Sequence, residues 1–315
     1  MNLKTTHALK IWQVTLLLAV GALLSGCAAM PSDSKNYSEF SGLGDADAHL
    51  TYNTAFPVAS ASEAILRGDA AVNKGDLDRA LFEYIRALEI DGADGETLYK
   101  IGRVHLARKD QERARLAFML CLKASPDHVD ALVEMGKLEM HRRNYESAES
   151  LLFHALEINP NLPRVYNAMG VIADMRKEHQ QAQKDYIQAI FLAGNKPIYM
   201  NNLGYSYYLM GCQDRAEQMF INTLKADPNY KQAWRNLGLV YAKSARYKLA
   251  LEAFGKTGKE YQAYNDVGYI AMLSGRYDEA QHYFNEAVRL SPAYYELAVR
   301  NAKRLDFLRE RRGTY

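Results

Sequence analysis

The sequence is poor in the residues and motifs on which most active sites depend. Its 315 residues include three cysteines and eight histidines, and these form no cluster with the spacing of metal ligands. It contains no HExxH zinc motif, no GxSxG motif of serine hydrolases and no glycine loop between a predicted strand and helix. These absences predict a protein that is not an enzyme and that needs no metal and no cofactor.

Charge of one sign is not in excess either. The chain has 39 lysines and arginines against 37 aspartates and glutamates, a formal net charge of +2. Lys4 and Lys10 lie in an N-terminal segment that we expect to be removed, and without them basic and acidic side chains are equal in number. The overall charge gives no support to nucleic-acid binding, so we expect no nucleic-acid partner.

Apolar runs long enough to cross a membrane are also missing. The largely apolar run from Ile11 to Leu24 has fourteen residues, whereas a helix that crosses the ~30 Å hydrocarbon core needs about 20. A basic stretch without acids, MNLKTTHALK, precedes this run, and that order is typical of a secretory signal peptide. The expected signal peptide covers residues 1–26.

The apolar run ends in Leu-Ser-Gly-Cys at residues 24–27, which resembles the lipobox of bacterial lipoproteins. The resemblance implies cleavage before Cys27, lipid attachment to Cys27 and, because Ala28 follows, sorting to the outer membrane. Our expected location is therefore the outer membrane, lipid-anchored and facing the periplasm. An ordinary signal peptide that happens to contain a cysteine is the alternative. Residues 27–60 carry no sustained apolar period, so we expect a flexible tether after the lipidated cysteine.

A glycine and an alanine recur along most of the chain at a fixed phase. The alanine follows its glycine by twelve residues every time, and successive pairs are 34 residues apart five times and then 30. Two helical periods flank a turn in each unit, so each unit is predicted to be a helix hairpin that must pack on its neighbours. The pairs are Gly68–Ala80, Gly102–Ala114, Gly136–Ala148, Gly170–Ala182, Gly204–Ala216, Gly238–Ala250 and Gly268–Ala280.

These glycines indicate close helix packing. A glycine inside a helix costs about 0.5–1 kcal/mol relative to alanine, so seven at one phase need a structural cause. We expect the second helix of each hairpin to lie on the first where glycine and alanine leave room. In six units an aromatic residue follows the alanine by four positions, and we expect its ring to fill the seam to the next unit. These residues are Tyr84, Phe118, Tyr186, Phe220, Phe254 and Phe284.

The 34-residue helix–turn–helix period resembles the tetratricopeptide repeat. The resemblance covers residues 61–294 and implies an all-α, tetratricopeptide-repeat superhelical solenoid of seven helix hairpins. The sixth repeat, residues 231–260, is four residues short, so its second helix should be shorter than the others. Residues 295–315 predict a C-terminal capping helix and basic tail, with Leu297, Leu305 and Leu308 covering the last hairpin. Cys121 and Cys212 fall about three repeats apart, so no disulfide between them is expected.

In the tetratricopeptide family the first helices line a concave face, and the resemblance implies the same face here. An asparagine amide can donate to a peptide carbonyl and accept from a peptide N–H, and tyrosine adds rigid contact area with a polar tip. A row of both predicts a groove for an extended peptide. The alternative is that some asparagines only bond neighbouring helices and some tyrosines only fill seams. The predicted groove residues are Asn167, Asn201, Asn202, Tyr205, Tyr208, Arg235, Asn236, Asn265 and Tyr269.

The C-terminal half narrows the expected function. Residues 263–298 read AYNDVGYIAMLSGRYDEAQHYFNEAVRLSPAYYELA. The lipobox and about residues 197–300, which include this stretch, resemble the TadD family of tetratricopeptide lipoproteins from tight-adherence (Flp, type IVb) pilus systems. The resemblance implies a non-enzymatic scaffold for protein partners of a pilus or secretion apparatus, the outer-membrane secretin among them, with the membrane reached through the N-terminal lipid. The alternatives are a pilotin-like lipoprotein of type IV pili, or a periplasmic enzyme or a regulator of one.

Overall fold

The computed structural model describes residues 41–44 and 58–313 of the chain. The predicted signal peptide, Cys27 and most of the predicted tether lie outside these residues. The described part contains fifteen α-helices and one short 3₁₀ helix, with no strand. Its two cysteines, Cys121 and Cys212, are unpaired, as expected.

The helices form seven hairpins followed by a single helix, as predicted, and we number the hairpins repeats 1 to 7 in chain order. They pair α3 (Ala61–Asn73) with α4 (Leu77–Asp91), α5 (Gly95–Ala107) with α6 (Gln111–Ala124), α7 (Val129–His141) with α8 (Tyr145–Ile158), α9 (Pro163–Met175) with α10 (His179–Ala193), α11 (Pro197–Leu209) with α12 (Gln213–Ala226), α13 (Lys231–Lys243) with α14 (Tyr247–Gly255), and α15 (Glu260–Leu273) with α16 (Tyr277–Leu290). The last helix is α17 (Glu296–Gly313).

A residue in the left-handed conformation forms the turn of every hairpin. Glycine occupies this position in repeats 1, 5 and 7, but the other four repeats hold Lys109, Arg143, Lys177 and Ala245, with φ between 58° and 66°. The next amide bonds back across the turn, as Asp110 N–H does to the carbonyl of His105 at 2.9 Å. That bond closes the first helix and offsets part of the roughly 1–2 kcal/mol that a left-handed non-glycine residue costs.

Within each hairpin, the recurring glycine faces a large side chain of the same hairpin. A Cβ added to Gly102 would lie 2.4 Å from the Phe118 ring, and one added to Gly204 would lie 2.8 Å from the Phe220 ring. Leu152 takes the place of the ring in repeat 3. The core clusters also group these rings with residues of the next repeat, as Phe220 with Ala233 and Leu237, in keeping with the predicted seam. The glycine clears space for a ring between the two helices of one hairpin. The other rings of this set are Tyr84, Tyr186, Phe254 and Phe284.

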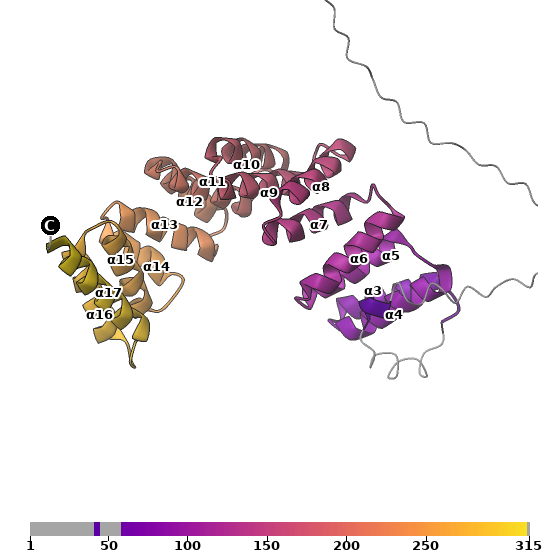
Figure 1. The fold of residues 1–315 in the computed structure, drawn as a ribbon, viewed down its shortest axis with the longest axis horizontal. Coiled ribbons are helices and arrows are strands. Elements are labelled where there is room, and N and C mark those ends of the chain that lie inside the picture. Colours follow the sequence, from indigo (N-terminus) through magenta and orange to yellow (C-terminus); the bar gives the residue numbers. More distant parts are fainter. Residues whose placement is uncertain (1–40, 45–57, 314–315) are drawn as a thin grey trace, which may run out of the picture.

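The hairpins stack into an open arc, with repeat 1 and α17 at opposite ends (Figure 1). From α7 onward, successive first helices contact one another, as α9 does α11 and α13 does α15. No two successive second helices of the described chain make comparable contact. The first helices therefore lie on the inside of the curve and the second helices on the outside.

The C-terminal end departs from regular repeats in two ways. The second helix of repeat 6, α14, has 9 residues against 14 or 15 in the other repeats, which confirms the expected shortening. Helix α17 then packs on repeat 7 through Leu305, which is fully buried, and through Leu308. Leu297 was wrongly predicted to cover that hairpin and is 38% exposed. The buried face begins one residue later, at Ala298, and a step of one residue turns a helix by about 100°.

Four residues of the predicted tether are docked on the solenoid. The 3₁₀ helix η1 (Ser41–Leu43) places the Leu43 side chain, which is fully buried, among core residues of repeats 1 and 2. The Leu43 carbonyl lies 2.8 Å from His105 Nε2. The expectation of a flexible tether is therefore wrong for residues 41–44, because a leucine flanked by glycines can enter an apolar groove.

Candidate functional site

A polar hollow opens on the inner face of repeats 5 to 7. Its volume is about 700 Å³, and its walls come mainly from the first helices α11, α13 and α15. Six of the nine predicted groove residues line it: Asn201, Asn202, Tyr205, Arg235, Asn236 and Tyr269. The other three, Asn167, Tyr208 and Asn265, do not. Gln232, Leu239, Phe254, Asp266 and Ile270 complete the lining.

The repeat register brings these side chains together. The ninth residue of a first helix shares a face with the fifth and the sixth, which precede it by four and three residues. In α11 these positions are Asn201, Asn202 and Tyr205. The sixth position of repeat 7 is Asp266, which sequence reasoning missed because it selected amides, tyrosines and an arginine. The position of Asp266 in the repeat register is the signal that could have identified it.

Three of the predicted groove asparagines are buried and bond neighbouring helices. Asn201, Asn236 and Asn265 are 3–4% exposed. The Asn236 amide donates to Asn201 Oδ1 at 2.9 Å, and Asn301 of α17 donates to Asn265 Oδ1 at 2.9 Å. These three residues were predicted to bond an extended peptide, and their bonds to other helices are those of the structural alternative. One bond joins α11 to α13 and the other joins α15 to α17.

A third amide pair is more open. Asn202 donates to Asn167 Oδ1 at 2.8 Å, and both side chains are half-buried. Because each amide has two donors and two acceptor lone pairs, one such bond leaves capacity for a ligand. Asn202 therefore fits both the structural role and the predicted groove role.

The accessible part of the hollow carries tyrosines and an arginine. Tyr205 is 39% exposed, and its ring stacks on Tyr208 with centroids 6.0 Å apart. Lys243 Nζ lies 4.9 Å from the Tyr208 ring centroid. Tyr208 thus contacts both a cation and Tyr205, and it supports the groove without lining it. Arg235 is exposed on α13 and can reach a ligand with several N–H donors.

Asp266 contributes to the hollow a carboxyl whose pKa is raised. Burial raises its pKa, while a bond from Asn265 Nδ2 at 3.4 Å and the charge of Arg235 act in the opposite direction. A ligand that brings a peptide N–H or a cation to this carboxyl would favour its ionised form. The hollow therefore presents a cation, an acid and amides side by side, which suits the alternating donors and acceptors of an extended backbone.

The described residues form neither a metal site nor a membrane-spanning helix. Those residues contain no group of three or more histidine, cysteine, aspartate or glutamate side chains that could hold a metal ion. None of the helices described is both long and apolar enough to span a bilayer.

Comparison with protein families identifies the repeat. Two family models, both described as tetratricopeptide repeat, match the chain: one at residues 261–294, the other at residues 65–120 and 213–259. The chain is a tetratricopeptide-repeat protein. As such it is a protein–protein interaction scaffold, and such scaffolds are typically non-enzymatic. No curated protein matches it significantly.

Solved structures share the tetratricopeptide fold at low sequence identity. A tetratricopeptide repeat protein from Parabacteroides merdae is 16% identical, with a TM-score of 0.60, and the match covers 79% of this chain and 99% of that one. PilF of Pseudomonas aeruginosa is 19% identical, with a TM-score of 0.52 and coverage of 69% and 97%. PilW, described as a widely conserved type IV pilus biogenesis factor, is 17% identical, with a TM-score of 0.55 and coverage of 65% and 96%.

Proposed function

We propose that this tetratricopeptide-repeat protein is a lipid-anchored scaffold of the outer membrane that binds an extended segment of a protein partner in its inner hollow. The partner belongs to a pilus or secretion apparatus of the tight-adherence (Flp, type IVb) kind, with the secretin as one candidate. The observation that carries the proposal is the hollow of repeats 5 to 7, where six predicted groove residues converge.

The chemistry of the hollow supports a peptide ligand. Asn202 and Gln232 can bond a backbone in both directions, and Tyr205 offers a rigid, partly exposed ring. Arg235 and Asp266 add one charge of each sign, so a segment with both an acidic and a basic residue would fit. The buried asparagines beneath them fix the spacing of the helices, and a preformed groove lowers the ordering cost of binding.

The location and the pilus assignment rest on sequence resemblance. The Leu-Ser-Gly-Cys stretch at residues 24–27 supports lipid attachment at Cys27, and the C-terminal repeats resemble tight-adherence lipoproteins. PilW, a type IV pilus biogenesis factor with the same fold, is in keeping with this assignment. A pilotin-like role would use the same anchor and the same hollow with a secretin subunit as the ligand.

The proposal is tested by affinity purification from outer membranes. The tagged full chain would be compared with an Arg235→Glu, Tyr205→Ala variant and with Lys248→Glu, an exposed charge reversal on α14 of repeat 6. We expect the parent and Lys248→Glu to retain a pilus or secretion component and the groove variant to lose it by about tenfold or more, which corresponds to about 1.4 kcal/mol. Thermal unfolding of all three should coincide.

Two outcomes would contradict the proposal. If the groove variant retains the partner as well as the parent does, the hollow is not the binding site. If Cys27→Ser still labels with fatty acid and stays in the outer membrane, the lipid anchor is wrong, whatever the groove binds. The anchor and the hollow can therefore fail separately.

A further inference from the structure

The docked segment at residues 41–44 occupies a groove on the outer side of repeats 1 and 2. Leu43 packs in a cluster that contains Ile85 of α4, Ile101 of α5 and Leu120 of α6. The glycines beside it are closely fitted, since a Cβ on Gly44 would lie 2.8 Å from Ile85 Cδ1 and one on Gly42 would lie 3.3 Å from Leu116 Cδ2. The chain itself therefore shows what this type of groove accepts: a leucine between two residues without side chains.

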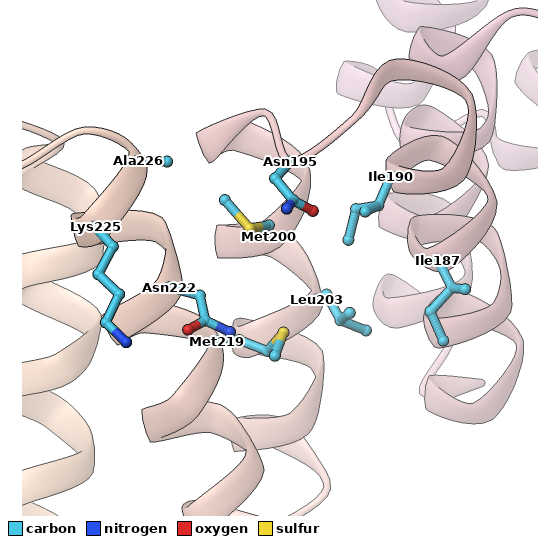
Figure 2. A pocket seen from close by; sticks show the side chains of 9 residues that line it. All are labelled: Ile187, Ile190, Asn195, Met200, Leu203, Met219, Asn222, Lys225 and Ala226. Atoms are coloured by element: carbon cyan, nitrogen blue, oxygen red, sulfur yellow. The ribbon is translucent and has the colours of Figure 1, made fainter.

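The same groove recurs, open, between repeats 4 and 5. A hollow of about 600 Å³ there is lined by α10, α11 and α12 (Figure 2). Ile187 and Ile190 form one side and Asn222 and Lys225 the other, with Met200, Leu203 and Met219 between them. We call this hollow the outer groove.

The outer groove shares the repeat register of the core cluster that contains Leu43. Six of its nine lining residues lie three 34-residue repeats after members of that cluster: Ile85 corresponds to Ile187, Leu88 to Ile190, Leu98 to Met200, Ile101 to Leu203, Ala117 to Met219 and Leu120 to Asn222. A further copy lies between repeats 5 and 6, where Tyr241 stands at the position of His105. The chain thus builds one type of groove at least three times.

Only the first copy is covered by the described chain. Ile85 is 5% exposed beside η1, whereas its counterpart Ile187 is 51% exposed. Phe191, one turn further along α10, is 80% exposed. Water therefore reaches apolar wall residues that the Leu43 segment shields in repeats 1 and 2. Burial of such residues is favourable by about 25 cal/mol per Å².

We propose that the outer groove binds a segment of a partner protein that carries a leucine-sized side chain between two small residues. This site lies on the outer side of the arc and is separate from the inner hollow. The occupant comes from another protein because a second copy of this chain would have to release its own Leu43, which is fully buried. Exposed Lys225 lines both open grooves, so an acidic residue near the leucine is favoured.

The chain supplies a probe for this site. A synthetic peptide with the sequence of residues 38–47, SEFSGLGDAD, holds the Gly-Leu-Gly core with acids on both sides. With a photoreactive leucine at the central position, it should crosslink the full chain at residues 187–190 and 219–222. Ile187→Asp should reduce that crosslink by about tenfold or more, because an apolar wall becomes charged. A peptide with aspartate in place of the leucine should not crosslink there.

The matched control is Phe153→Asp. In repeat 3, Phe153 occupies the position that Ile187 has in repeat 4, and it is also 51% exposed. The substitution therefore places the same charge on the same outer surface. Crosslinking at the outer groove should be unaffected by it. Equal loss in both variants, or crosslinks confined to residues 85–120, would overturn the proposal. A dimer in sedimentation that Leu43→Asp abolishes would also overturn it, because the occupant would then be a second copy.

Discussion

Asp185 is a buried carboxyl whose charge opposes folding. It lies on α10, is 7% exposed and accepts a hydrogen bond from Gln181 Nε2 at 3.0 Å. Burial raises its pKa from 3.8 to about 6; the Gln181 bond and Lys184 oppose this shift, and Glu149 adds to it. Because the folded-state pKa is the higher one, stability is greatest while the acid is neutral. Stability falls as the pH rises from about 4 through 6.

Replacing Asp185 by asparagine should remove this pH dependence. At pH 8 the Asp185→Asn variant should be about 1–3 kcal/mol more stable than the parent, because a shift of one pKa unit is worth about 1.4 kcal/mol. At pH 3.5 the two proteins should be close to equal, since the carboxyl is then neutral in both folded and unfolded chains. Urea unfolding at both pH values measures the difference. Parallel stability curves across this range would show that Asp185 is not the group responsible.

The role of a single residue was predicted well where it follows from the position in the repeat. It was predicted poorly where it depends on a neighbouring side chain. The repeat register identified every glycine and alanine of the helix contacts, because these residues recur at a fixed spacing. It did not show that Asn236 bonds Asn201, since an asparagine looks the same whether its amide meets a ligand or another helix. The left-handed turns at Lys109 and Ala245 were equally hidden, because neither residue type favours that conformation.

At the scale of helices, each hairpin is held by a large side chain against a glycine. In repeat 5, Phe220 is fully buried and reaches the place where a Gly204 side chain would be. The ring cannot move away without opening space elsewhere in a close-packed interior. The contact therefore fixes how closely α11 and α12 approach.

Gly204→Ala should destabilise the protein by about 1–3 kcal/mol, because a Cβ would lie 2.8 Å from the Phe220 ring and 3.0 Å from Met219 Cβ. In a Phe220→Ala background the same change should be neutral or stabilising, since the ring is gone. Gly255→Ala is the matched control: no atom lies within 4 Å of an added Cβ there, so stability should stay equal or rise. Thermal melts of the four variants test this, and a Gly204→Ala melt that overlays the parent would refute the assignment.

Helices were easier to predict than the segment before them. Periodicity and the repeat spacing located all seven hairpins and the shortened α14, because each covers an apolar face that recurs. Residues 41–44 carry a lone leucine in a polar stretch, which has no period to detect. The contact of each aromatic ring with the glycine of its own hairpin was not predicted for a related reason: spacing indicates which face a residue shares, but not every neighbour that it meets.

In the whole molecule, contacts between helices join repeats that follow one another along the chain. Each hairpin packs mainly on the hairpins before and after it, so stability depends on each repeat and on its interfaces. Repeat 6 is the irregular member, because α14 is only 9 residues long. Repeat 7 and α17 are joined to the rest of the arc through this repeat.

Hydrogen exchange should show repeat 6 as the weak point of the array. Amides of α14 should exchange about tenfold faster or more than those of α12, which has 14 residues, because a shorter helix has fewer packed turns and opens at lower cost. Exchange followed by mass spectrometry at neutral pH measures both helices in one protein. Equal protection of α12 and α14 would mean that packing against α13 and α15 fully offsets the lost length.

The bonded asparagines set a limit on how such an array can change during evolution. Asn167 and Asn202, and likewise Asn201 and Asn236, are 35 residues apart, so one inserted or deleted residue between them would turn an amide away from its partner. Asn236 and Asn265, by contrast, do not bond each other: Asn236 bonds Asn201, and Asn265 bonds Asn301 of α17. Four residues are missing from the repeat between them. Length variation is thus tolerated where no amide pair spans the repeat, and related chains should carry their insertions and deletions at that junction.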